Sequence, residues 1–132
     1  MTSASAPDAP FQFYDTTLRD GAQREGISYS VNDKLAVAQI LDGLGVGFIE
    51  GGWPGALPKD TEFFARAGTE LQLRNAVLVA FGATRKARAN VRTDPQVAAL
   101  LAAETPVVTL VAKSDVRHVE RALKTTLDEN LA

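Results

Sequence analysis

The sequence predicts an α/β fold with a parallel sheet, built from four βα units that form half of a (β/α)8 TIM barrel. Continuous apolar runs alternate with amphipathic segments in the order βαβαβαβα, which is typical of parallel sheets with right-handed crossovers. These runs begin near residues 11, 47, 76 and 106, and a spacing of about 30 residues matches one unit of an eight-stranded barrel of about 250 residues. An open doubly wound sheet fits the same alternation and is the alternative architecture.

The first unit begins with an apolar run over residues 11–18. Turn signals bound this run on both sides, so it predicts a buried strand. A loop over residues 21–29 leads to Ser30, which is a typical helix N-cap, with Asp33 in the first turn of the helix. We expect this helix to end at Gly45, because glycine suits a helix exit.

The second and third units repeat the pattern. Residues 48–52 predict a strand that runs into a proline- and glycine-rich loop over residues 53–58. A helix then begins at Pro58 or Lys59, and residues 76–82 predict the third strand as a continuous apolar run. The apolar residues of this second helix are Phe63, Phe64, Ala67 and Leu71.

The fourth strand lies between two further helices. A basic segment over residues 84–92 predicts a loop or an irregular helix, and Asp94 and Pro95 then open a third helix. Residues 106–112 predict the fourth strand. Apolar side chains are expected to face inward from the third helix and to form a stripe on a last helix: Val97, Leu100 and Leu101 on the former, and Val116, Val119, Leu123, Leu127 and Leu131 on the latter.

Length, charge and composition argue against several classes of function and partner. With 132 residues and a net charge of −2, the chain gives no electrostatic reason to expect nucleic acid or an anionic membrane as a partner. No apolar run approaches the roughly 20 residues that span a bilayer. The chain has no cysteine, which fits a cytoplasmic protein. Residues 1–10 have no basic start and no apolar centre, so they predict a disordered leader before a single domain over residues 11–132.

Polar or glycine-rich residues follow all four predicted strands, which is where parallel α/β folds gather their functional groups. One such strand end would be unremarkable, but four together predict an active site. The residues are Asp15, Arg19, Asp20 and Gln23 after the first strand, Glu50 to Trp53 after the second, Gly82 and Thr84 after the third, and Lys113 to Asp115 with His118 after the fourth.

The pair Arg19 and Asp20 suits chemistry at a carbonyl group. A carboxylate at a strand end can ligate a hard divalent cation, and an adjacent arginine can stabilise charge on an enolate or alkoxide oxygen. A structural ion pair is the alternative interpretation, and Glu50 is likewise either functional or a carboxylate buried beneath the site. A surface or capping role is favoured for His118 and loop packing for Trp53. The basic segment favours a solvated face over a phosphate or coenzyme A contact.

These motifs resemble a known enzyme family. The sequence Asp15-Thr-Thr-Leu-Arg-Asp-Gly21 resembles the signature opening of the family of 2-isopropylmalate, homocitrate and citramalate synthases and related acyl-CoA lyases, which are metal-dependent TIM barrels. Residues 48–55, 58–64, 105–111 and 125–130 resemble the citramalate synthase branch in particular. The resemblance covers nearly the whole chain after the leader.

The resemblance implies a Claisen-type condensation of acetyl-CoA with an α-keto acid, with pyruvate as the keto acid and citramalate as the product, in branched-chain amino-acid biosynthesis. It also implies a divalent cation (Mg, Mn or Zn). Asp20 would ligate the cation, and Arg19 would polarise the keto oxygen as a catalytic residue. Glu50 would belong to the catalytic set and, with Gln23, would support the substrate end of the pocket. The substrate-binding residues would further include Phe81, in an apolar wall, and His118.

The chain also departs from the family pattern. The His-x-His motif and the catalytic carboxylate that the family carries on later strands are absent, and residues 113–118 lack the family's tryptophan. We therefore expect this chain, as the N-terminal half-barrel, to be inactive by itself, to hold a divalent cation weakly, and to form a homo-oligomer through its open side. An isopropylmalate or homocitrate synthase or a hydroxymethylglutaryl-CoA lyase is the alternative enzyme. A non-catalytic half-barrel assembly module is the alternative of another class.

Overall fold

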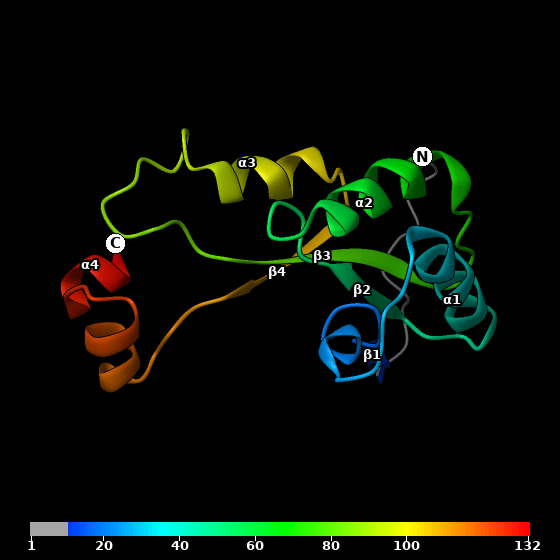
Figure 1. Ribbon diagram of the computed structural model, residues 1–132, viewed down its shortest axis with the longest axis horizontal. Coiled ribbons are helices and arrows are strands. Elements are labelled where there is room, and N and C mark those ends of the chain that lie inside the picture. Colours follow the sequence, from blue (N-terminus) through cyan, green and yellow to red (C-terminus); the bar gives the residue numbers. More distant parts are fainter. Residues whose placement is uncertain (1–10) are drawn as a thin grey trace.

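The computed structural model describes residues 11–132, so the predicted leader over residues 1–10 lies outside the described residues. Four strands form one parallel sheet in the order β1-β2-β3-β4 (Figure 1). A doubly wound sheet would reverse its strand order at a switch point, and this order has no reversal. The sequential order therefore supports the half-barrel over the doubly wound alternative. The strands are β1 (Tyr14–Asp15), β2 (Phe48–Gly52), β3 (Val77–Ala83) and β4 (Val107–Val111).

Three helices lie on the same face of the sheet, where Figure 1 shows α2 and α3 above β3 and β4, and α1 beside α2. Each predicted helix before β4 is confirmed, with its start within a residue of the expected position. No helix within residues 11–132 is long and apolar enough to cross a membrane. The helical elements are η1 (Gly21–Gln23), α1 (Val31–Gly43), α2 (Pro58–Glu70), α3 (Pro95–Ala102), η2 (His118–Ala122) and α4 (Leu127–Leu131).

The start of α1 is a reciprocal capping box. The Ser30 hydroxyl accepts a hydrogen bond from the Asp33 amide at 3.1 Å, and the Asp33 carboxylate accepts one from the Ser30 amide at 2.8 Å. Both orphan amides at the helix start are thereby satisfied, as the sequence predicts. The helix ends at Gly43, and Gly45 follows with a φ of +80°, a backbone conformation that favours glycine.

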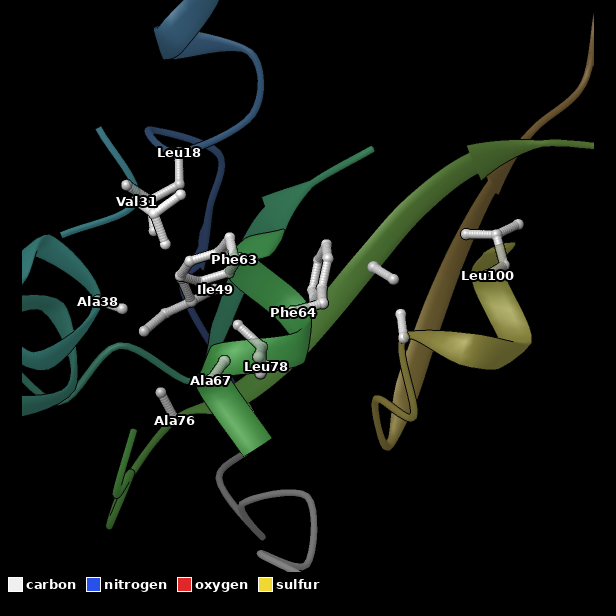
Figure 2. Packing of buried hydrophobic residues seen from close by; sticks show 12 residues of the cluster. Leu18, Val31, Ala38, Ile49, Phe63, Phe64, Ala67, Ala76, Leu78 and Leu100 are labelled. Atoms are coloured by element: carbon white, nitrogen blue, oxygen red, sulfur yellow. The ribbon is translucent and has the colours of Figure 1, made fainter. Parts of the chain in front are cut away.

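The core lies between the helices and the sheet. Figure 2 shows Leu18, Val31, Ile49 and Phe63 packed together, with Leu100 on α3 at some distance from them. The contact between α2 and β2 requires Gly51, because a Cβ atom there would lie 2.5 Å from Cε1 of Phe63. The absence of that side chain lets the helix approach the strand closely.

The first strand is shorter than the apolar run predicts, and the expected strand over residues 11–18 is wrong at both ends. The carbonyl of Thr16 accepts hydrogen bonds from the amides of Arg19, Asp20 and Gly21, so the chain turns out of the sheet directly after Asp15. The apolar run correctly predicts a strand in this segment, but it does not show how many of its residues pair with β2.

The predicted last helix is also wrong, because residues 116–131 form two short pieces rather than one helix. Lys124 adopts a φ of +53°, which interrupts the helix, and Thr126 then caps α4. Of the predicted apolar stripe only Val119 is buried. Leu101 on α3 is 75% exposed rather than inward-facing. These apolar side chains have no packed surface above them within residues 11–132, so the apolar pattern does not produce a continuous buried helix.

A hydrogen bond across the sheet shows that the sheet is curved. The Tyr14 hydroxyl on β1 lies 2.6 Å from the Thr109 hydroxyl on β4. Three strand spacings separate these edge strands, which amounts to about 14 Å in a flat sheet. The two side chains meet because the sheet bends toward the face opposite the helices, as the wall of a barrel does.

A buried carboxylate joins the end of α1 to the start of β3. Asp42 accepts hydrogen bonds from the amides of Arg74, Asn75 and Ala76 at 2.8–3.0 Å. Burial raises the pKa of the Asp42 carboxyl, but these backbone donors outweigh burial and leave the pKa below its usual value. The ionised carboxylate is therefore the form that the folded chain stabilises.

We predict that Asp42→Asn lowers the free energy of unfolding by about 1–3 kcal/mol at pH 7, because a charged acceptor of three amides becomes a neutral one. The folded pKa lies below the unfolded value of about 3.9, so the stabilisation is complete above that pH and is lost as the pH falls through the folded pKa. Urea unfolding between pH 7 and pH 3 would show the two proteins converging at low pH. Asp128→Asn, at an exposed aspartate, is the control, and a pH-independent difference for Asp42→Asn would contradict the assignment.

Candidate active site

Arg19 is held on three sides at the carboxyl ends of the strands. Its Nε donates to Oε1 of Glu50 at 2.6 Å, and its Nη1 donates to Oδ1 of Asp20 at 3.0 Å. Its Cζ lies 4.1 Å from the centre of the Phe81 ring, a cation–π contact. Four residues predicted from three different parts of the sequence therefore meet at one place.

Local structure explains this convergence. Arg19 and Asp20 lie on the tight turn that follows β1, Glu50 lies in β2 and Phe81 lies in β3. Because the strands are parallel and adjacent in chain order, their carboxyl ends share one edge of the sheet. The turn after β1 places the guanidinium over the carboxyl ends of β2 and β3.

Burial differs sharply among the charged groups. Glu50 is 2% exposed, while the side chains of Arg19 and Asp20 are 18% and 64% exposed. A buried carboxylate needs a positive partner, and Arg19 provides it for Glu50. Among residues 11–132, nothing accepts a hydrogen bond from Nη2 of Arg19, so this part of the guanidinium is available to a ligand.

The hydroxyl pair of Tyr14 and Thr109 also belongs to this region, and the sequence does not single it out. Burial raises the pKa of the Tyr14 hydroxyl above its usual value, and the nearby Glu50 carboxylate adds to the rise. Tyr14 is therefore protonated at neutral pH and can donate a hydrogen bond. The available sequence signal is a hydroxyl-bearing aromatic residue in the first strand, one position before Asp15.

An aromatic contact supports the Arg19 site from below. The Trp53 ring meets the Phe81 ring edge-on, with centres 5.2 Å apart and planes at 81°. The indole N–H of Trp53 is buried and has no hydrogen-bond partner among the described residues. The prediction of loop packing for Trp53 is confirmed in that its ring packs on a neighbouring side chain, and that neighbour is Phe81.

Two predicted site residues are not among the groups that hold Arg19. Gln23 is exposed at the end of η1, where its amide donates to the Asp20 carbonyl at 3.0 Å, and its side chain forms no hydrogen bond within residues 11–132. His118 is exposed at the start of η2, and Figure 1 shows that segment at the opposite end of the molecule from β1. The structure thus gathers Arg19, Asp20, Glu50 and Phe81. It places Gln23 next to Asp20 on the same turn and places His118 far from both.

Two other features lie away from Arg19. In the basic segment, Arg85 forms an ion pair with Glu129 at 2.8 Å, and the Lys86 amide donates to Asp94, so part of the segment is tied into the fold. A cleft of about 580 Å³ lies between α2, the start of β3 and the segment that precedes β4, and it is lined by residues such as Phe64, Leu71 and Pro106. The cleft contains no cluster of titratable side chains, so chemistry is better supported at Arg19.

The residues present do not build a divalent-cation site. Within residues 11–132, no three histidine, cysteine, aspartate or glutamate side chains are placed to hold a metal ion. Asp20 offers one exposed carboxylate, and Arg19 already engages one of its oxygens. Divalent cations such as Mg²⁺ and Ca²⁺ take six or more oxygen ligands, so Asp20 alone leaves most of such a shell to water.

Comparisons with known proteins agree with these motifs. The family model described as HMGL-like matches residues 10–132. The (R)-citramalate synthase of Streptomyces coelicolor is 65% identical over 132 residues, which cover 100% of this chain and 25% of that protein. The (R)-citramalate synthase of Aquifex aeolicus is 56% identical over 89% of this chain and 22% of that protein. The 2-isopropylmalate synthase of a Synechocystis strain is 36% identical over 90% of this chain and 22% of that protein. The chain spans about a quarter of the length of these relatives.

We predict that Arg19→Met destabilises the chain by about 3 kcal/mol, because it leaves the buried Glu50 carboxylate without its positive partner. The double substitution Arg19→Met with Glu50→Leu should recover most of that loss, since no unpaired charge remains. Urea unfolding of both variants measures the difference. Arg117→Met, which breaks an exposed pair with Asp115, is the control and should have little effect. Equal destabilisation by the single and double variants would contradict this interpretation.

Proposed function

Because the chain belongs to the HMGL-like family, we propose that it is the N-terminal part of an enzyme that condenses acetyl-CoA with an α-keto acid. The keto acid is pyruvate and the product is citramalate. Identities of 46–65% to (R)-citramalate synthases, against 35–36% to 2-isopropylmalate synthases, favour the small keto acid over a branched one. The observation that carries the proposal is the Arg19 guanidinium fixed at the sheet edge with Nη2 available.

The proposed reaction forms one carbon–carbon bond and then breaks a thioester. A base removes a proton from the methyl group of acetyl-CoA, and the resulting enolate carbon attacks the keto carbon of pyruvate. The keto oxygen gains negative charge as its π bond opens. The alkoxide takes up a proton equivalent to the one removed from the methyl group and becomes the hydroxyl of citramalate. Water then cleaves the thioester and releases coenzyme A and citramalate.

Arg19 supports this step electrostatically. Its Nη2 group donates a hydrogen bond to the keto oxygen, which becomes an alkoxide, and a preorganised donor stabilises that charge more than it stabilises the neutral ketone. Glu50 acts through Arg19, because it is buried beneath the guanidinium and fixes its orientation through Nε. The ring of Phe81 supports the guanidinium from its stacked face, and its role in an apolar wall beside the reacting carbon stays part of this proposal.

A divalent cation enters this proposal only through Asp20, which we propose as one ligand. The described residues do not complete a cation site, so no step is derived through a metal. Gln23 and His118 stay predicted substrate-binding residues. Gln23 already adjoins Asp20, whereas His118 would have to approach the site from η2. The cytoplasmic location and the lack of a nucleic-acid or membrane partner also stay predictions from composition.

The test is a chimaera in which residues 11–132 of this chain replace the matching segment of the S. coelicolor (R)-citramalate synthase, to which the whole chain is 65% identical. We predict pyruvate-dependent release of coenzyme A by the chimaera, and a much slower reaction with bulkier branched keto acids. Arg19→Lys should lower kcat by about 100-fold to 1000-fold, because lysine cannot reproduce the stacked, forked donor geometry.

The same substitution at Arg66, which lies on α2 in an exposed pair with Glu70, is the matched control and should leave kcat unchanged. Activity with a branched keto acid in place of pyruvate would favour an isopropylmalate synthase. A folded chimaera without activity on any keto acid would contradict the proposal and favour the non-catalytic assembly module.

We also propose that this chain, taken alone, is inactive and pairs with a second copy. The two outer strands β1 and β4 have unpaired backbone edges within residues 11–132, and apolar Val108, Leu110 and Val111 on β4 are exposed. Exposed apolar edge strands favour pairing with another chain.

Light scattering on this chain should therefore give the mass of a dimer. A lysine substitution at Leu110 on the β4 edge should shift the equilibrium toward monomer, whereas lysine at Ile40, which is equally apolar and exposed on α1, should not. A monomer at all concentrations would contradict the pairing.

A further inference from the structure

We propose that the buried ion pair of Lys34 and Asp60 positions the Arg19 guanidinium. The ion pair does so indirectly, through contacts made by Trp53 and Phe81. Lys34 lies on α1 and Asp60 on α2, and their side chains are 1% and 7% exposed. Nζ of Lys34 donates to Oδ1 of Asp60 at 2.5 Å. The proposal rests on the function proposed for Arg19, although its structural part can be tested without activity.

Asp60 also fixes the backbone at the end of β2. Its second oxygen, Oδ2, accepts a hydrogen bond from the Trp53 amide at 2.9 Å. The carboxylate therefore joins two helices to the first residue after the strand. A charged acceptor makes such a bond stronger than a neutral acceptor would.

The packing around Gly52 shows how closely the chain approaches this pair. A Cβ atom on Gly52 would lie 2.6 Å from Cγ of Asp60 and 2.9 Å from Nζ of Lys34, and Gly52 has a φ of +153°. Only glycine fits this position without displacing the ion pair. The backbone at Gly52, which is preceded by Glu50 and followed by Trp53 in the chain, therefore packs directly against the ion pair.

Two contacts carry this placement to Arg19. Glu50, two residues before Gly52, binds Nε of Arg19 directly. Trp53, one residue after Gly52, packs edge-on against Phe81, and Phe81 underlies the guanidinium at 4.1 Å. Of the three groups that hold Arg19, Glu50 therefore lies on the backbone that Asp60 anchors, and Phe81 contacts that backbone's Trp53.

A purely stabilising role is the competing explanation, and a pair of double variants separates the two. A buried ion pair can often be replaced by apolar residues at little cost in stability. Lys34→Met with Asp60→Leu removes the charges and the acceptor for the Trp53 amide. Lys34→Met with Asp60→Asn removes the charges but keeps a carbonyl acceptor for that amide.

Two readouts on this chain report on the site without any reaction. Trp53 is the only tryptophan, so fluorescence and its quenching by acrylamide report on its burial. The side-chain Nε–H resonance of Arg19, assigned by its loss in Arg19→Lys, reports on the bond to Glu50. We expect both signals to change in the leucine variant and to be restored in the asparagine variant, with similar unfolding midpoints for the two proteins.

In the chimaera, the leucine variant should lose about 100-fold in kcat, as expected for a small displacement of a catalytic group, and the asparagine variant should recover most of that loss. Unchanged fluorescence and Arg19 resonance in a folded leucine variant would overturn the inference. If the leucine variant does not fold, Asp60→Glu takes its place, because it keeps the charge but shifts the acceptor by one methylene. An inactive parent chimaera would overturn the proposed function, while the two spectroscopic readouts would still decide this inference.

Discussion

The ion pair between Arg19 and Glu50 is the interaction on which the arrangement of this end of the sheet depends. Glu50 is buried in β2, and burial of a carboxylate is tolerable only when a positive group accompanies it. That requirement draws the turn after β1 across the sheet edge and fixes one edge of the guanidinium. Asp20 and Phe81 contact two further sides of the guanidinium. Together the three contacts fix the orientation of its remaining N–H groups.

Three buried aspartates also fix neighbouring segments, in their case by accepting hydrogen bonds from backbone amides. Asp42 accepts from the amides directly before β3, Asp60 accepts from the Trp53 amide, and Asp94 accepts from amides of the basic segment and of the start of α3. Each joins a helix end to a neighbouring loop or strand. The chain therefore uses short acidic side chains as internal connectors, and Glu50 differs from them because its partner is a side chain at the candidate site.

The alternation of strands and helices, three of the helices, and the positions of Arg19, Asp20 and Glu50 at strand ends follow from the sequence because they rest on local rules. The strand order needs the structure, and Phe81 is expected only from the family resemblance. Apolar periodicity, the capping box at Ser30 and the polar strand ends need no knowledge of distant neighbours. The failures involve long-range partners. Whether residues 116–131 form one helix depends on a surface that covers their apolar stripe, and Leu101 is exposed for the same reason. The role of Tyr14 needs Thr109, 95 residues away, and the role of Asp60 appears only when Gly52 is seen to fold against it.

The shortness of β1 has a consequence for motion. Within residues 11–132, Tyr14 and Asp15 form the register pairs with β2, and the Phe13 carbonyl accepts from the amides of Gly47 and Phe48, so few backbone hydrogen bonds must break to release this segment. Local opening of such an edge costs less free energy than global unfolding. The guanidinium is thus delivered by the least firmly paired strand and is retained mainly by side-chain contacts with Glu50 and Phe81. Detachment of β1 from β2 would carry Arg19 away and uncover Glu50. Breaking the Arg19–Glu50 ion pair and fraying of the first strand are therefore coupled in one equilibrium.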